Sequence, residues 1–156
     1  MASSSVTHSR FVVERLFPQP AATVFAAFAD PAKKKIWFAQ SDQHEVDEFV
    51  SDFRVGGAER LRYRFVGETP IKGMMLTSEG RHEDIVPDQR VVTSSRMLLG
   101  DTCFSCSLVT IELLEEAGGT RLLCTFQGAF FEGSDGPEIR QMGWEKLMDR
   151  LGASLA

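Results

Sequence analysis

Hydrophobic and polar residues alternate with a period of two over most of the chain, which is typical of strands that bury one face. Leu61, Tyr63 and Phe65 alternate with arginines, so this stretch predicts a strand with one apolar and one cationic face. Glycine, proline and aspartate turns separate further segments of the same kind. The predicted strands cover residues 10–17, 49–55, 60–65, 82–86, 90–97, 102–114 and 122–126. Short turns between successive strands indicate an antiparallel meander.

Two short helices are predicted after the first strand. Pro18 and Pro20 end that strand, and the next apolar residues have the i, i+3, i+4, i+7 spacing of one helical face. Asp30-Pro31 ends this helix and begins a second, short one that runs through Lys33–Lys35 toward Ile36-Trp37-Phe38. The residues on the first helical face are Ala21, Val24, Phe25 and Phe28.

A long amphipathic helix is predicted at the C-terminus. Asp135 and Glu138 have the spacing of a capping box, and Pro137 suits the first turn. Burial of the five side chains on its apolar stripe would contribute on the order of 10 kcal/mol, so packing rather than helix propensity should hold it. The stripe consists of Trp144, Leu147, Met148, Leu151 and Leu155.

This order of elements predicts an α+β fold in which a curved antiparallel sheet wraps around a long C-terminal helix. The chain has 156 residues, of which 43% are hydrophobic and 25% charged, and it contains no linker or repeat, so we expect one domain over residues 1–156. Twelve phenylalanines accompany a single tyrosine, which favours a large, dry interior.

The distribution of charged and apolar residues limits the classes of partner that we expect for this protein. A formal net charge of −5 argues against nucleic acid, and the run Lys33–Lys35 is expected to lie on a solvated helix face. Residues 1–5 lack the layout of a signal peptide, and no apolar run approaches the ~20 residues of a membrane span, so we expect a cytoplasmic protein. A homodimer is compatible with the sequence, although no segment has an interface pattern.

Three cysteines do not form a disulfide framework. Cys103 and Cys106 form a C-x-x-C on a predicted strand, where residues three apart point to opposite faces. Hairpin pairing should set Cys124 opposite Ile111 or Glu112, away from both. We therefore expect three small, buried, reduced thiols with no redox or metal role.

Few motifs for catalysis or cofactor binding are present. The three histidines, His8, His44 and His82, lie far apart in the sequence, and neither a nucleophile elbow nor a glycine-rich phosphate loop occurs. The sequence therefore predicts no metal and no cofactor, and it assigns no catalytic residue.

Several turn motifs follow one another in this order of elements: Asp52-Phe53-Arg54-Val55-Gly56-Gly57, Asp84-Ile85-Val86-Pro87-Asp88, Gly118-Gly119-Thr120-Arg121-Leu122, Gly128-Ala129-Phe130-Phe131 and Gly143-Trp144. Together with the order of the elements, they resemble the START/Bet v 1-like (SRPBCC) superfamily from about residue 9 to residue 155. Within it, the chain is similar to the family related to the C-terminal domain of the activator of the heat-shock protein 90 ATPase. The resemblance implies a helix-grip fold with a cavity between the sheet and the C-terminal helix. It implies no shared activity, since the superfamily includes lipid and hormone binders, cyclases and ring-hydroxylase subunits.

The strand at 82–86 carries ionisable residues on both faces. One register sends Glu83 inward and the other sends His82 and Asp84 inward, and the sequence leaves the choice open. A group that points inward would need a partner, for which Arg96 on a neighbouring strand is a candidate, or a wet cavity. It would then serve as a polar anchor for a ligand or as a general acid or base. Alternatively, the strand end flares into solvent or a bulge resets the faces.

We expect the site between the sheet and the helix to bind a small lipophilic molecule. Tyr63 carries the only aromatic hydroxyl and would orient the ligand. One alternative is a cofactor-free isomerase, cyclase or hydrolase that uses an interior carboxylate or histidine. Another is a stress-related or co-chaperone-like interaction module. The candidate binding residues are Trp37, Phe38, Tyr63, Phe65, His82, Glu83, Arg96, Trp144 and Met148.

Overall fold

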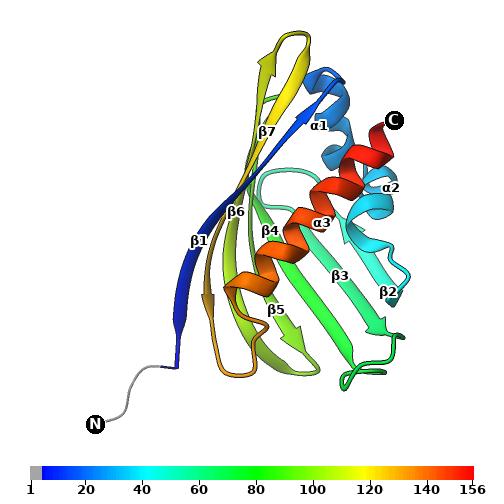
Figure 1. Ribbon diagram of the computed structural model, residues 1–156, viewed down its shortest axis with the longest axis vertical. Coiled ribbons are helices and arrows are strands. Elements are labelled where there is room, and N and C mark those ends of the chain that lie inside the picture. Colours follow the sequence, from blue (N-terminus) through cyan, green and yellow to red (C-terminus); the bar gives the residue numbers. More distant parts are fainter. Residues whose placement is uncertain (1–4) are drawn as a thin grey trace.

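The computed structural model describes residues 5–156, and its centre is a seven-stranded antiparallel sheet that curves around a long helix (Figure 1). The strands lie in the order β1-β7-β6-β5-β4-β3-β2, so the first strand pairs with the last and all other neighbours are consecutive. The predicted α+β helix-grip fold is confirmed. The strands are β1 (Thr7–Phe17), β2 (His44–Ser51), β3 (Ala58–Phe65), β4 (Met75–Val86), β5 (Arg90–Leu99), β6 (Thr102–Glu116) and β7 (Gly119–Phe130).

The largest departures from the predicted boundaries are at the starts of β2 and β4. β2 begins at His44 and ends at Ser51, because the segment up to Gly57 forms a folded turn. β4 begins at Met75, well before the predicted start at His82. Most of the segment in which no signal peptide was recognised, residues 1–4, lies outside the described residues. None of the described helices is both long and apolar enough to cross a bilayer.

The helical segments after β1 are α1 (Ala21–Ala29), α2 (Pro31–Lys34) and a π-helical turn, η1 (Lys35–Ala39). The Asp30 carboxylate accepts a hydrogen bond from the backbone N–H of Ala32 at 2.9 Å, so it caps α2 as predicted. The indole Nε1 of Trp37 is buried and donates to the carbonyl of Ala27 at 3.0 Å. This bond fixes η1 against α1.

Helix α3 (Pro137–Leu155) crosses the curved face of the sheet, and its C-terminal half lies beside α1 and η1 (Figure 1). Pro137 occupies the first turn as predicted, but the predicted capping box is wrong. The N-cap is Gly136, and the Asp135 carboxylate binds the Arg140 guanidinium instead, at 2.8 Å. A bidentate bond to a buried guanidinium is stronger than a bond to an exposed backbone N–H.

The main core lies between β1, β6, β7, α1 and the C-terminal half of α3, a region called here the packed end. Met148 and Leu151 of α3 are completely buried there, as are Val24 and Leu122. The remaining residues of the predicted stripe, Trp144, Leu147 and Leu155, pack against this core but are only partly buried.

A bulge at Glu83 decides which face of β4 points inward. His82 pairs with Thr93 and Asp84 pairs with Val92, so Glu83 is the extra residue. His82 is completely buried, and beyond the bulge Ile85 faces the same side as the buried Val91. The bulge thus sends His82 and Ile85 inward while Glu83 stays outside.

The turn before β3 docks at this point of β4. The backbone N–H of Gly56 donates to the carbonyl of His82 at 2.7 Å, and that of His82 donates to the carbonyl of Gly57 at 3.0 Å. Gly56 has a φ of 85°, which favours glycine, and a Cβ at Gly57 would collide with the carbonyl oxygen of Asp52. The glycine pair therefore allows the loop to close over His82.

A second bulge, at Phe104 in β6, overturns the predicted arrangement of the cysteines. Cys103 pairs with Leu98 and Cys106 pairs with Arg96, so both cysteines lie on the same outer face of the sheet. Burial and the neighbouring Cys103 thiol raise the pKa of Cys106. Cys103 is half-buried and Cys106 exposed, so the prediction of three buried thiols is wrong for these two.

Cys124 agrees with the prediction. It lies opposite Ile111 and is completely buried in the packed end. Burial raises the pKa of its thiol to about 12.

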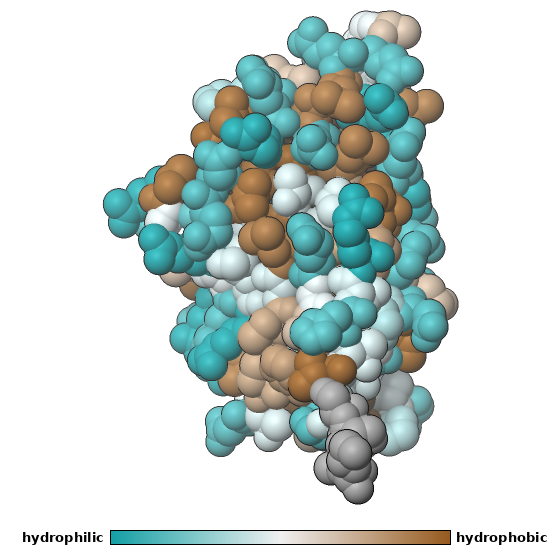
Figure 2. Space-filling model, turned by 90° about the vertical axis from the view of Figure 1, so that its left-hand side faces the viewer, coloured by the Kyte–Doolittle hydropathy of each residue, from teal (hydrophilic) through white to brown (hydrophobic). Residues whose placement is uncertain are grey.

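The outer face of the sheet carries cross-strand ion pairs. Arg60 lies 3.3 Å from Glu48 and 3.8 Å from Glu79, which also binds Arg96 at 2.8 Å. Figure 2 shows the side of the molecule that Figure 1 has on the left, where hydrophobic and hydrophilic side chains are mixed. Two exposed apolar residues of β1, Val12 and Leu16, belong to this outer surface. Scattered exposed apolar residues of this kind are ordinary in soluble proteins.

Candidate functional site

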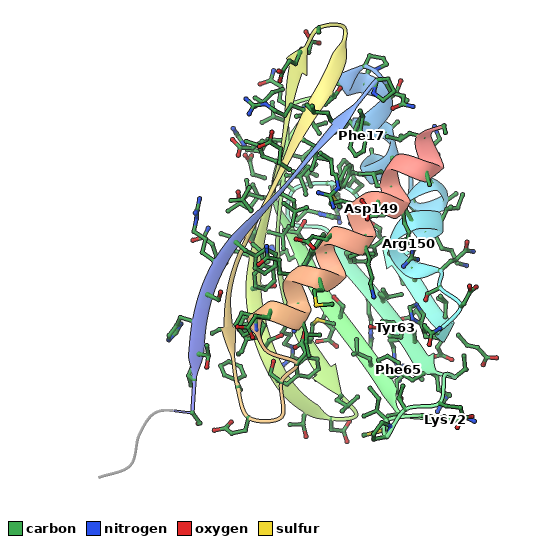
Figure 3. The ribbon with its side chains drawn as sticks, viewed as in Figure 1. Phe17, Tyr63, Phe65, Lys72, Asp149 and Arg150 are labelled. Atoms are coloured by element: carbon green, nitrogen blue, oxygen red, sulfur yellow. The ribbon has the colours of Figure 1, made fainter. Side chains whose placement is uncertain are left out.

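A cavity of about 690 Å³ lies between the inner face of the sheet and α3, next to the packed end. Alternation along the strands directs one row of side chains of each toward it, mostly apolar in β3 and partly polar in β4 and β5, where Ser78, Thr93 and Ser95 contribute. Figure 3 shows Tyr63 and Phe65 of β3 on the side of the sheet that α3 covers. The apolar lining includes Trp37, Phe38, Leu61, Tyr63, Phe65, Leu76, Val91, Met97, Leu99, Phe104, Val109, Ile111, Trp144 and Leu147.

One stripe of α3 forms the mouth of the cavity. Ile139, Gly143, Lys146 and Arg150 are spaced by four, three and four residues, so they share one helical face, and all four line the cavity. Ile139 is 60% exposed, and Gly143 and Lys146 are also exposed, so the cavity opens to solvent along this stripe. A Cβ at Gly143 would meet no other atom within 4 Å. Packing therefore does not require a glycine here.

At one end, the cavity is bordered by a buried ion pair between α2 and β3. Both carboxylate oxygens of Glu59 lie 2.8 Å from Lys34 Nζ, and the two side chains are each only 8% exposed. The hydroxyl of Ser51 donates to Glu59 at 3.0 Å. The ammonium also lies 4.6 Å from the centre of the Phe38 ring. A charge pair this deeply buried needs such additional contacts to offset its desolvation.

His82 lies behind this ion pair. Its Nε2 is 3.6 Å from the Glu59 carboxylate and 3.4 Å from Ser51 Oγ, and its Nδ1 is 3.2 Å from Thr93 Oγ1. Burial lowers the pKa of the imidazole, Glu59 opposes that shift, and Lys34 adds to it. The imidazole is therefore neutral at pH 7.

A second buried cation lies where α3 begins. Arg140 binds Asp135 through two bonds of 2.8 Å and Ser105 Oγ at 3.0 Å. Its guanidinium also lies 5.1 Å from the Phe130 ring centre, with Phe104 and Phe126 slightly farther away. Like Lys34, this cation has its own carboxylate partner.

Tyr63 stacks on His44 at the wall near the mouth, with ring centres 3.9 Å apart. His44 Nε2 lies 2.7 Å from the Ala39 carbonyl, which fixes the ring against η1. Burial raises the pKa of Tyr63 to about 12, so its hydroxyl stays protonated at pH 7. Its oxygen makes no hydrogen bond to the described part of the chain, which leaves it free for a ligand.

Five of the nine predicted binding residues line this cavity. Met148 does not, because it lies one helical face away, completely buried in the packed end. His82 is also completely buried, but it reaches the cavity only through Glu59 and Thr93. The five predicted residues that line the cavity are Trp37, Phe38, Tyr63, Phe65 and Trp144.

The expectation that Glu83 and Arg96 reach the interior is wrong. The Glu83 side chain is 40% exposed and accepts a hydrogen bond from Ser94 at 3.2 Å on the outer face. Arg96 is 54% exposed and pairs with Glu79, not with the His82 strand end. The bulge removes Glu83 from the inner face, and the strand register keeps Arg96 outside.

Lys34, Glu59 and Arg140 were missed. A signal for Glu59 was present, because it shares the parity of Leu61, Tyr63 and Phe65 along β3. Lys34 gave no such signal within its run of three lysines, and the expectation that this run is solvated is wrong for it. Arg140 lies one turn before Trp144, on the face of α3 that turns toward the sheet.

Comparison with known protein families identifies the family to which this chain belongs. Residues 18–156 match the model of the family described as activator of Hsp90 ATPase homolog 1-like protein. The chain belongs to this family. No curated protein matches it.

Solved structures agree with that assignment. The Mll3558 protein from Rhizobium loti is 42% identical, with a TM-score of 0.83 over 97% of this chain and 99% of that one. A putative uncharacterised protein from Rhizobium leguminosarum is 34% identical, with a TM-score of 0.87 over 97% and 96%. An AHSA1-like protein from Aeromonas hydrophila, 21% identical with a TM-score of 0.68 over 94% and 92%, shares the fold. None of these names states a ligand.

Proposed function

We propose that this protein binds a small lipophilic molecule between the sheet and α3. The observation that carries the proposal is the cavity itself: about 690 Å³ lies within the range of small-molecule pockets. Its walls are mostly aromatic and aliphatic, with a few polar groups at defined places, which is the usual composition of such a pocket. Tyr63, Phe65 and Trp144 would contact the apolar body of the ligand.

Gly143 supports the same proposal. Glycine within a helix costs about 0.8–1.0 kcal/mol relative to alanine, and here no neighbouring atom excludes a larger side chain. A residue that weakens the helix without a packing reason is consistent with a need for open space at the mouth.

The decisive experiment has two parts: ligands are first identified, and the open space at Gly143 is then filled by a larger side chain. Native mass spectrometry of the freshly purified protein would detect a molecule that co-purifies, and a thermal-shift screen of fatty acids, sterols, flavonoids and small aromatics would find further ligands. A ligand at a hundredfold excess over Kd stabilises the folded state by roughly 2.7 kcal/mol. Gly143→Leu should abolish these shifts without lowering the melting temperature of the free protein, because leucine favours the helix.

Ala153→Leu is the matched control, since Ala153 is exposed on α3 and does not line the cavity. It should leave every ligand shift unchanged. Equal shifts in the wild type and in Gly143→Leu would rule out binding through this mouth.

A second candidate is acid–base catalysis on the bound molecule, favoured by the buried Lys34–Glu59 pair that borders the cavity. Glu59 would transfer the proton, with Lys34 and Ser51 orienting its carboxylate. Glu59→Gln should then retain binding of a screened ligand while its conversion, followed by mass spectrometry, stops. Binding without conversion in the wild type would exclude this candidate for that ligand.

The family description also names homologues of an Hsp90 ATPase activator. The alternative of a co-chaperone-like module is tested by adding the protein to Hsp90 and measuring ATP hydrolysis. A stimulation that Gly143→Leu does not change would favour that alternative.

A further inference from the structure

The cations that line the cavity fall into two groups. Lys34 and Arg140 are both buried, and each has its own carboxylate, Glu59 and Asp135 respectively. Lys146 and Arg150, which line the mouth, make no ion pair with any residue that the structure describes. The mouth therefore carries excess positive charge on a chain whose formal net charge is −5.

Arg150 is the more constrained of the two. It is half-buried, and its Nη2 atom is shielded from solvent without a hydrogen-bond acceptor among the described residues. Burial lowers the pKa of its guanidinium, while the Asp42 carboxylate opposes this without forming an ion pair. A shielded donor without an acceptor is costly, so a turn of the Arg150 side chain that brings this donor to an acceptor in the mouth would be favoured.

The direction of the side chain fits that role. Figure 3 shows Asp149 and Arg150 on different sides of α3. Asp149 binds Arg15 of β1 at 3.0 Å at the packed end, whereas Arg150 lines the cavity near His44, whose lowered pKa it helps to lower further. Gly143, two turns earlier on the same face, leaves the path from Arg150 into the cavity open.

We propose that the ligand is an amphipathic organic anion whose acidic group binds Arg150 at the mouth while its apolar body lies in the cavity. This inference rests on the proposed binding function and adds the chemical class of the ligand. A planar guanidinium binds a carboxylate, sulfonate or phosphate through paired hydrogen bonds, and partial burial strengthens them. A lipophilic cation would meet repulsion from Lys146 and Arg150, whereas a neutral lipid would offer Arg150 at most an uncharged acceptor, which forms a weaker hydrogen bond.

Two probes of equal chain length test this directly, decanoate and decan-1-ol, titrated calorimetrically at pH 8. Wild-type protein should bind decanoate about tenfold or more tightly than decan-1-ol, because a hydrogen bond to a charged group is worth a factor of ten to a hundred in affinity. Arg150→Gln should remove that advantage and leave the affinity for decan-1-ol unchanged. Arg150→Lys keeps the positive charge but lacks the paired N–H donors of the guanidinium, so it should retain part of the preference for decanoate.

Arg62→Gln is the matched control. Arg62 also has a buried Nε without an acceptor, but it lies on the outer face of β3 and does not line the cavity. This variant should bind both probes as the wild type does. The melting temperatures of all variants would show whether each is folded.

The outcomes separate the two proposals. Equal affinity for both probes, with no effect of Arg150→Gln, would overturn the anion site and leave lipophilic binding intact. An equal loss for both probes in Arg150→Gln would make Arg150 a structural residue and overturn the anion site as well. If neither probe bound to the wild type, both proposals would fail.

Discussion

Helix α3 has two sides that face different surroundings. Met148 and Leu151 are completely buried at the packed end, against β1, β7 and α1. One face away, Gly143, Lys146 and Arg150 line a cavity of about 690 Å³, called here the hollow end. One helix therefore combines close packing with unfilled space.

Under the proposed binding function, this contrast separates the residues of the helix that stabilise the fold from those that would contact the ligand. Packed side chains contribute the free energy of burial, whereas apolar side chains that border a void give up part of it. The aromatic residues Tyr63 and Phe65 of β3 remain partly exposed although strand alternation directs them inward. An interior that leaves this surface unburied is typical of a protein that binds a molecule there.

The largest effect on the free energy of unfolding is expected at the buried Lys34–Glu59 ion pair that borders the cavity at the hollow end. Lys34→Met would leave the Glu59 carboxylate buried without its cation, and this should cost about 3–5 kcal/mol in the free energy of unfolding. Urea unfolding measures it. Lys33→Met, at the exposed neighbouring lysine, is the control and should change little. A loss below about 1 kcal/mol for Lys34→Met would show that the pair is hydrated.

The two leucines of α3 test the contrast itself. Leu151→Ala at the packed end should cost about 2–5 kcal/mol, as other buried leucine truncations do. Leu147→Ala should cost only about 1 kcal/mol, because Leu147 is partly buried and already borders the cavity. Equal losses at both positions in urea unfolding would contradict the division into a packed and a hollow end.

A smaller effect concerns pH. The unfolded chain protonates His82 near the ordinary pKa of 6.5, whereas the folded protein does so only at lower pH. Stability from the neutral imidazole is therefore complete above pH 6.5 and is lost as the pH falls through the lowered pKa. His44 acts in the same direction, since burial lowers its pKa too.

Unfolding free energies at pH 8 and pH 5 measure this loss. His82→Gln should reduce the difference between the two pH values, and His8→Gln, at an exposed position, should not. If the unfolding free energy of His82→Gln fell between pH 8 and pH 5 by as much as that of the wild type, the pH dependence would belong to other groups.

The smallest perturbation uses the single tyrosine as a probe of the hollow end. Burial raises the pKa of Tyr63 to about 12, so only about a tenth of it should be ionised at pH 11. Ultraviolet difference absorption reports this without interference from another tyrosine. Nearly complete ionisation at pH 11 in the folded protein would mean that water fills the cavity freely.

Period-two and helical patterns predicted five of the residues that line the site. Alternation along the strand fixes the face of Tyr63 and Phe65 and so predicted both. Trp37, Phe38 and Trp144 were predicted because they are large aromatic residues of the helical segments expected beside the sheet. Glu59 obeys the same alternation, but it lies one residue before the predicted start of this strand at residue 60, whereas β3 begins at Ala58. Met148 was assigned to the pocket because a helical stripe does not reveal which of its residues meet a neighbour and which meet a void.

The sequence by itself determined the order of the elements and the inward face of each regular strand, because these follow from local spacing and turn chemistry. Tertiary structure alone decided where the alternation breaks, at Asp47, Glu83 and Phe104, since a bulge depends on the partner strand. It also decided that Lys34 is buried, because only the folded chain brings Glu59 of β3 within 2.8 Å of it. The cavity belongs to this second class. It is the space left when α3 is anchored at the packed end, and no local pattern encodes the distance between two surfaces that do not touch.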